Sequence, residues 1–341
     1  MFGITRKVKN NKPKNKTEEP TITVEKPKNT LRRPKIGLAL GSGVARGWAH
    51  IGILRRLEEE GIKIDFIAGT SVGAVVGGAY AAGALNELED WTKTLGNYSF
   101  FKFLDFKFSG GGLFGGTSLN DLMKLKFGEK DFKDLDIPFT AVACELKTGH
   151  EIWLDEGKIS DAIQASFAMP GIFEPVSHKR RWLVDGALVN PVPVSACRAA
   201  GCEMVIAVNL SEDLYGRVMK VRKGSKGNGE YGVFQEMVKD TNQMVGDGSK
   251  SLFRKIFSHK GTAPSLFANM VASLNILQNR LSRSRLAGDP PDITISPRCG
   301  HIGLMEFHRA EELIEEGVIA FDENLSKLED ALEIITHRMN S

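Results

Sequence analysis

The segment that most constrains the fold is residues 64–83, where a short apolar run leads into the pentapeptide Gly-Thr-Ser-Val-Gly. Residues 66–68 predict the end of a buried strand, and the small residues after Gly73 predict a helix packed closely on a sheet. This G-x-S-x-G spacing is typical of a nucleophile elbow. Gly69 and Gly73 keep Cβ atoms away from a sharp turn that exposes Ser71 at a helix N-terminus. The alternative is a structural turn in which Ser71 only caps the helix.

A second glycine-rich turn precedes this one, between an expected strand at 35–40 and an expected helix at 48–60. Its residues are Gly41, Ser42, Gly43, Val44, Ala45, Arg46 and Gly47. The spacing fits neither a Walker loop, which needs G-K-[ST], nor a Rossmann fingerprint, which is one residue shorter. Backbone N–H groups in such a loop bind an anion. Three ligands stay open: a nucleotide phosphate, a lipid phosphate, or the oxyanion of an acyl-transfer intermediate.

The two turns are expected at one edge of the sheet, because neighbouring parallel strands end on the same side. One turn then offers hydrogen-bond donors and the other a serine. A nucleophile beside an oxyanion hole is what acyl transfer requires.

A nucleophilic serine also needs a base, and two residues qualify. Asp185 ends an expected strand at 181–184 and would take the proton directly, provided that dry surroundings raise its pKa above the ordinary value of about 4. His301 follows the last expected strand, at 290–295, and suits the Ser-acid-His order of α/β-hydrolases. The glycine-rich loop precedes the serine by only about 25 residues, and the chain lacks the strands that an α/β-hydrolase places before its elbow; both features argue against that order. Asp185 as a simple turn or cap acid is the structural alternative.

Composition narrows the class of protein. The 341 residues are 42% hydrophobic, enough for a large core, and no apolar run is long enough for a transmembrane helix. The basic N-terminus is not followed by an apolar stretch and does not read as a secretory signal. A net charge of +3 is too small to predict a nucleic-acid partner. The four scattered cysteines predict reduced packing residues of a cytosolic protein, and no metal or cofactor is expected.

We expect three regions along the chain: a disordered basic tail at 1–33, a catalytic domain at 34–318 and a helical extension at 319–341. Within the domain, the aromatic segment 91–114 is either a mobile apolar cover or ordinary core, and a short helix is expected after it, up to residue 126. The basic excursion 211–262 either faces an anionic membrane or is a solvated insertion.

Helices are expected at the C-terminal end of the domain. Residues 263–286 predict a long helix with Leu266, Met270, Leu274 and Leu277 on its apolar face. Residues 304–317 and 318–338 predict surface helices.

Taken together, the motifs resemble those of the bacterial patatin-like phospholipase family. The resemblance is carried by residues 41–47, 69–73 and 185–187, with 165–170 and 302–307 in support. It implies a three-layer α/β/α fold with a mainly parallel central sheet, a Ser–Asp dyad without histidine, and hydrolysis of fatty acyl esters without a metal.

Matched motif by motif, the resemblance makes Ser71 the nucleophile and Asp185 the general base. It places the oxyanion hole in Gly41, Ser42, Gly43 and Val44. It gives supporting roles to Arg46, Gly47, Gly69, Gly73 and Gly186. This chain departs from the family where three or four glycines often stand in a row, because Ser42 and Val44 carry side chains.

The sequence therefore predicts a cytoplasmic serine lipid acyl hydrolase of the phospholipase A or lysophospholipase type, in peripheral contact with the inner face of a membrane. Two alternatives stay open. An acyltransferase would use the same dyad, and a regulatory module would bind lipid without turnover.

Overall fold

The computed structural model describes residues 32–95, 105–106, 112–115, 130–212 and 266–341. The predictions for the tail 1–31, for most of the aromatic segment, for the short helix after it and for nearly all of the basic excursion lie outside these residues. Among the described residues, no helix is both long and apolar enough to span a bilayer.

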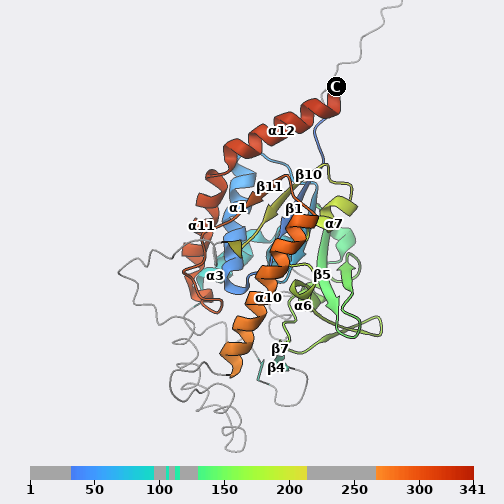
Figure 1. Cartoon of the computed structure of the whole chain (residues 1–341), viewed down its shortest axis with the longest axis vertical. Coiled ribbons are helices and arrows are strands. Elements are labelled where there is room, and N and C mark those ends of the chain that lie inside the picture. Colours follow the sequence, from blue (N-terminus) through green and yellow to red (C-terminus); the bar gives the residue numbers. More distant parts are fainter. Residues whose placement is uncertain (1–31, 96–104, 107–111, 116–129, 213–265) are drawn as a thin grey trace, which may run out of the picture.

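An eight-stranded mixed sheet forms the centre of the molecule (Figure 1). Its parallel strands are β1 (Ile36–Leu40), β2 (Phe66–Thr70), β5 (Phe139–Glu145), β10 (Met204–Val208) and β11 (Ile293–Ile295). Its antiparallel strands are β6 (Glu151–Leu154), β8 (Val176–His178) and β9 (Arg181–Asp185). Every residue of β1, β2 and β10 is buried, as expected for parallel strands covered on both faces.

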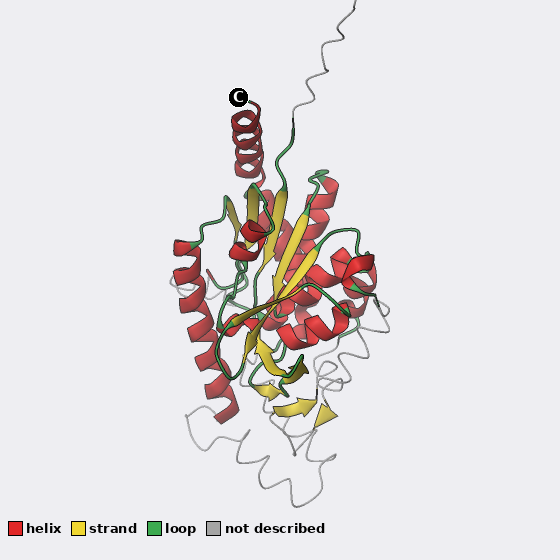
Figure 2. Cartoon of the chain, turned by 90° about the vertical axis from the view of Figure 1, so that its right-hand side faces the viewer, coloured by secondary structure: helices red, strands yellow, loops and turns green. Residues whose placement is uncertain are grey.

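Helices cover both faces of this sheet (Figure 2). One hydrophobic core joins Leu38 and Leu40 to α1 (Ala49–Glu59), α2 (Val72–Ala81), α6 (Ile159–Ser166) and α11 (Ala310–Asp322). The second core joins Ala39 to α7 (Val194–Ala199). Because neighbouring strand residues point to opposite faces, the two cores lie on opposite sides of the sheet. The predicted three-layer α/β/α fold with a mostly parallel sheet is confirmed.

Smaller elements complete the described chain. They are helices α3 (Leu85–Lys93), α10 (Leu266–Gly288) and α12 (Leu325–Asn340), a second sheet of β3 (Asp105–Phe106), β4 (Gly112–Gly115) and β7 (Gly171–Phe173), and short 3-10 turns at Val44–Trp48, Phe132–Asp134, Gly186–Leu188 and Phe307–Arg309. Figure 1 shows α12 at one end of the molecule and β4 and β7 at the other.

Strands β2 and β9 lie end to end along the same edge of β5. Val142 pairs with Thr70 of β2 and also with β6, while Ala143 pairs with Asp185 of β9 and also with β6. Since a strand has only two edges and β6 occupies one, β2 and β9 must share the other. Both strands therefore end at the same point on β5, and they approach it from opposite directions.

Helix α11 lies on the outer side of the molecule, as predicted, with Glu311, Glu312 and Glu315 exposed. Its inner face packs tightly on α1, because an added Cβ on Gly317 would lie 2.0 Å from the Ala49 carbonyl oxygen. The prediction for the apolar face of α10 is wrong in part. On α10, the expected apolar position Leu277 is exposed, and the buried face carries Gln278, Asn279 and Ser282. These polar side chains tolerate burial because Asn279 bonds the Ser211 carbonyl and Ser282 bonds the Gln278 carbonyl.

Candidate active site

The predicted turn between a strand and a helix is present at Ser71, which links β2 to α2. Ser71 has φ 58° and ψ −124°, a backbone conformation that residues other than glycine avoid. Close approach explains the glycines around it, since a Cβ on Gly73 would lie 2.1 Å from the Leu40 carbonyl oxygen. A Cβ added to Gly47, Gly69 or Gly186 would likewise lie 2.5 Å or less from another atom.

Ser71 is buried, with 1% of its surface exposed, so the expectation of an exposed serine is wrong. The Ser71 N–H donates a hydrogen bond to the Ser166 hydroxyl, and the Ser71 hydroxyl donates one to Asp185. Both partners are themselves buried. The turn is consequently packed against α6 and β9.

Ser71 and Asp185 meet because β2 and β9 end at neighbouring residues of β5. The Ser71 hydroxyl donates to Asp185 Oδ2 over 2.7 Å, and the N–H of Ala187 donates to Oδ1 over 2.8 Å. Burial raises the pKa of Asp185 to about 6, although both hydrogen bonds act to lower it. The carboxylate is therefore a stronger base than an ordinary aspartate.

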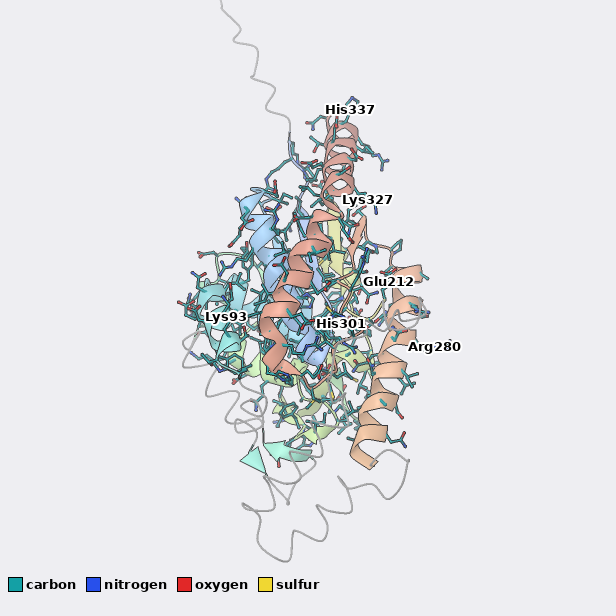
Figure 3. The ribbon with its side chains drawn as sticks, turned by 90° about the vertical axis from the view of Figure 1, so that its left-hand side faces the viewer. Lys93, Glu212, Arg280, His301, Lys327 and His337 are labelled. Atoms are coloured by element: carbon teal, nitrogen blue, oxygen red, sulfur yellow. The ribbon has the colours of Figure 1, made fainter. Side chains whose placement is uncertain are left out.

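His301 lies elsewhere, on the outer side of the molecule beside α11 (Figure 3). Its Nε2 pairs with Glu312 over 2.8 Å, and its side chain is half exposed. The arrangement around Ser71 thus favours Asp185 over His301 as the base.

The glycine-rich loop 41–47 lies at the same edge of the sheet, because β1 and β2 are parallel neighbours. Two of its N–H groups are already engaged: that of Gly41 donates to Val208 over 3.1 Å, and that of Ser42 donates to Pro191 over 2.9 Å. The N–H groups of Gly43 and Val44 meet no acceptor within the part of the chain that the structure describes. Of the four predicted oxyanion residues, these two are the available donors.

Val44 is the second strained residue of the site, with φ 53°. A β-branched residue is a genuine outlier in this region of backbone space. Such strain persists only when the surrounding structure holds it, and it is concentrated at functional sites.

Three contacts hold the loop in place. The N–H of Ala45 donates to the Leu304 carbonyl over 3.1 Å, and the buried Arg46 side chain donates to the Ile302 carbonyl over 2.8 Å. His50 Nε2 lies 2.8 Å from the Gly41 carbonyl and must donate to it. Burial lowers the pKa of His50 to about 4, so this histidine is neutral at physiological pH. Arg46 thus supports the loop, and the predicted segment 302–307 is its anchor.

Sequence reasoning did not single out Ser166 as a functional residue. Its hydroxyl donates to the Val142 carbonyl over 2.6 Å and accepts the Ser71 N–H over 2.9 Å. It therefore ties the strained turn to β5. The signal available was its place in the 165–170 motif, on the helix that precedes Asp185.

Comparison with known proteins gives consistent matches. Residues 38–198 match the family model described as patatin-like phospholipase. An uncharacterized NTE family protein of Mycobacterium tuberculosis is 32% identical over 324 residues, covering 83% of this chain and 89% of that protein. Human patatin-like phospholipase domain-containing protein 6 is 29% identical over 182 residues, covering 51% of this chain and 13% of that protein. The neuropathy target esterase sws of Drosophila melanogaster is 28% identical over the same length.

The fold and the matched relatives define the class as hydrolases of carboxylic esters built on an α/β/α sandwich. The chain belongs to the patatin-like phospholipase family.

Proposed function

We propose that the protein hydrolyses fatty acyl esters of lipids through a dyad of Ser71 and Asp185. The observation that carries the proposal is the 2.7 Å hydrogen bond from a serine in a strained turn to a wholly buried carboxylate. With a pKa of about 6, Asp185 is ionised at neutral pH and still basic enough to accept a proton.

In the first half of the reaction, the Ser71 oxygen attacks the acyl carbonyl carbon while its proton passes to Asp185 Oδ2. The negative charge that forms on the carbonyl oxygen is stabilised by the N–H groups of Gly43 and Val44, which meet no acceptor among the described residues. Collapse of this intermediate breaks the ester bond, and the proton held by Asp185 passes to the departing alcohol.

In the second half, a water molecule gives its proton to Asp185 and attacks the acyl group on Ser71. The fatty acid then leaves, and the proton returns to the Ser71 oxygen. Each proton is taken and returned by the same carboxylate, so no histidine is required.

The test is acyl release from p-nitrophenyl esters, lysophospholipids and phospholipids. Ser71→Ala should lose at least about 10⁴-fold in kcat/KM, and Asp185→Asn about 10²- to 10⁴-fold. His301→Ala is the matched control and should keep full activity. Unchanged turnover in either dyad variant, or a large loss in the control, would contradict the proposal.

Product analysis separates hydrolysis from acyl transfer. With glycerol or a lysolipid added as acceptor, a hydrolase continues to release free fatty acid as its main product. A shift of most acyl groups to the acceptor would make the protein an acyltransferase with the same dyad.

We also propose a cytoplasmic location. The support is that all four cysteines are free and buried, as is usual in a reducing compartment. Fractionation of cells that express the tagged chain tests this location.

A further inference from the structure

The hairpin formed by β8 and β9 ends in a strained basic turn. His178 pairs with Arg181, which leaves Lys179 and Arg180 as a two-residue turn with φ 46° and 67°. Turns with positive φ at both positions strongly prefer Asn-Gly. Long cationic side chains are thus kept where the backbone disfavours them, and this points to a role for the charges.

Large apolar side chains are exposed beside this turn. Trp182 is 58% exposed and Leu146 is 53% exposed. The Leu146 N–H donates to the Trp182 carbonyl over 2.8 Å, so the two residues are neighbours across β5 and β9. One other tryptophan is exposed: Trp153, on β6 beside β5. The remaining two, Trp48 and Trp91, are buried in the core.

Cations surround the exposed pair. Lys147, Arg180 and Arg181 are exposed, and no carboxylate of the described residues pairs with them. Glu156 pairs with Lys179 and Glu151 pairs with Arg285, while Glu145, beside Leu146, accepts a hydrogen bond from the Thr148 hydroxyl. The surface therefore combines an apolar centre with a positive rim.

The hairpin lies at the active-site edge of the sheet. Trp182 and Asp185 are on the same strand, about 10 Å apart at the usual rise per residue. The turn points away from the end of β2, beyond the last residue of β5. Whatever binds the hairpin is consequently close to Ser71 and Asp185.

We propose that this hairpin surface, made of Leu146, Lys147, Arg180, Arg181 and Trp182, docks on an anionic phospholipid bilayer. The indole and the leucine enter the headgroup region, and the cations meet lipid phosphates. The choice of a lipid partner rests on the proposed function. The surface itself rests on exposure and charge.

The experiment measures binding of full-length Ser71→Ala protein, which leaves the lipid intact, to vesicles of phosphatidylcholine with and without phosphatidylglycerol. We expect co-sedimentation with the anionic vesicles, which weakens with salt, and a blue shift of tryptophan emission. Trp182→Ser should weaken binding at least about fivefold. Ile334→Ser is the matched control, because Ile334 is also 58% exposed but lies on α12.

A second variant guards against misfolding. Lys179→Asn with Arg180→Gly installs the preferred turn, so the hairpin should fold at least as well, yet binding should fall roughly 5- to 30-fold. Lys327→Gln with Arg338→Gln removes two charges from α12 and should change nothing; Figure 3 shows Lys327 on that helix.

Absence of binding to anionic vesicles, or equal binding by the hairpin variants and the parent, would overturn the proposal. So would a change from dimer to monomer in Trp182→Ser, because the surface would then be a contact between copies. If the wild-type protein binds the vesicles but releases no fatty acid, the proposed function is rejected and the hairpin surface remains supported as a membrane-docking site.

Discussion

Ser71 adopts a backbone conformation that glycine reaches freely and alanine does not. Replacing Ser71 by Gly should relieve strain that Ser71→Ala retains, so the glycine variant should be more stable than the alanine variant by about 1 kcal/mol. Urea unfolding of the two variants measures this difference. Equal stabilities would mean that the turn is not strained.

The carboxyl group of Asp185 predicts the pH dependence of activity. In the proposed mechanism only the ionised form accepts the Ser71 proton, and burial raises the pKa of Asp185 to about 6. We expect kcat/KM to fall about tenfold for each pH unit below this value. A rate profile over pH 4 to 9 on a soluble ester measures it. A rate that holds constant down to pH 4 would show that another group is the base.

The same shift predicts a cost in stability. The pKa of about 6 in the folded state lies above the ordinary aspartate value of 3.8, so folding favours the protonated form. The contribution of Asp185 to the free energy of unfolding is therefore complete below pH 4 and is lost as the pH rises through 6. Asp185→Asn should therefore be more stable than wild type by about 1–3 kcal/mol at pH 8 and show little gain at pH 4. Thermal unfolding at both pH values measures the gain, and equal gains would contradict the assignment.

At the scale of elements, α1 and α11 pack at unusually short range through Gly52 and Gly317. Gly317→Ala should destabilise the protein by about 1–3 kcal/mol, because its Cβ would lie 2.0 Å from the Ala49 carbonyl. Chemical unfolding measures this loss. Ser326→Ala on the exposed face of α12 is the control, where alanine should be neutral or slightly stabilising.

Local chemistry made much of the site predictable. The glycines around Ser71 and the apolar run before it specify a strand, a tight turn and a helix, and Asp185 at its strand end follows from the same logic. The end-to-end arrangement of β2 and β9 was not predictable, because it depends on which residues of β5 each strand pairs with. The close packing of α11 on α1 was not predictable for a similar reason: whether a glycine in a helix makes a close contact depends on the helix that lies against it.

At the scale of the whole molecule, α12 lies away from the site. Asn340 bonds Arg32, which lies just before β1 begins. Ser71 follows the last residue of β2, and because β1 and β2 are parallel this is the opposite edge of the sheet. Removing residues 324–341 should leave kcat/KM unchanged and lower Tm by about 5–10 °C, because the buried Leu328 is lost. Activity and calorimetry of the shortened chain test this, and a large fall in activity would tie α12 to the proposed catalytic domain.

The meeting of β2 and β9 on β5 also bears on the order of folding. Ser71 and Asp185 belong to strands that do not pair with each other, and the distance between them is set only when both have docked on β5. A nascent or refolding chain that has formed β1, β2 and β5 holds the serine turn without Asp185, its proposed base. Recovery of esterase activity during refolding therefore reports the docking of β9, and a burst of sheet formation before any activity would be the kinetic signature of this arrangement.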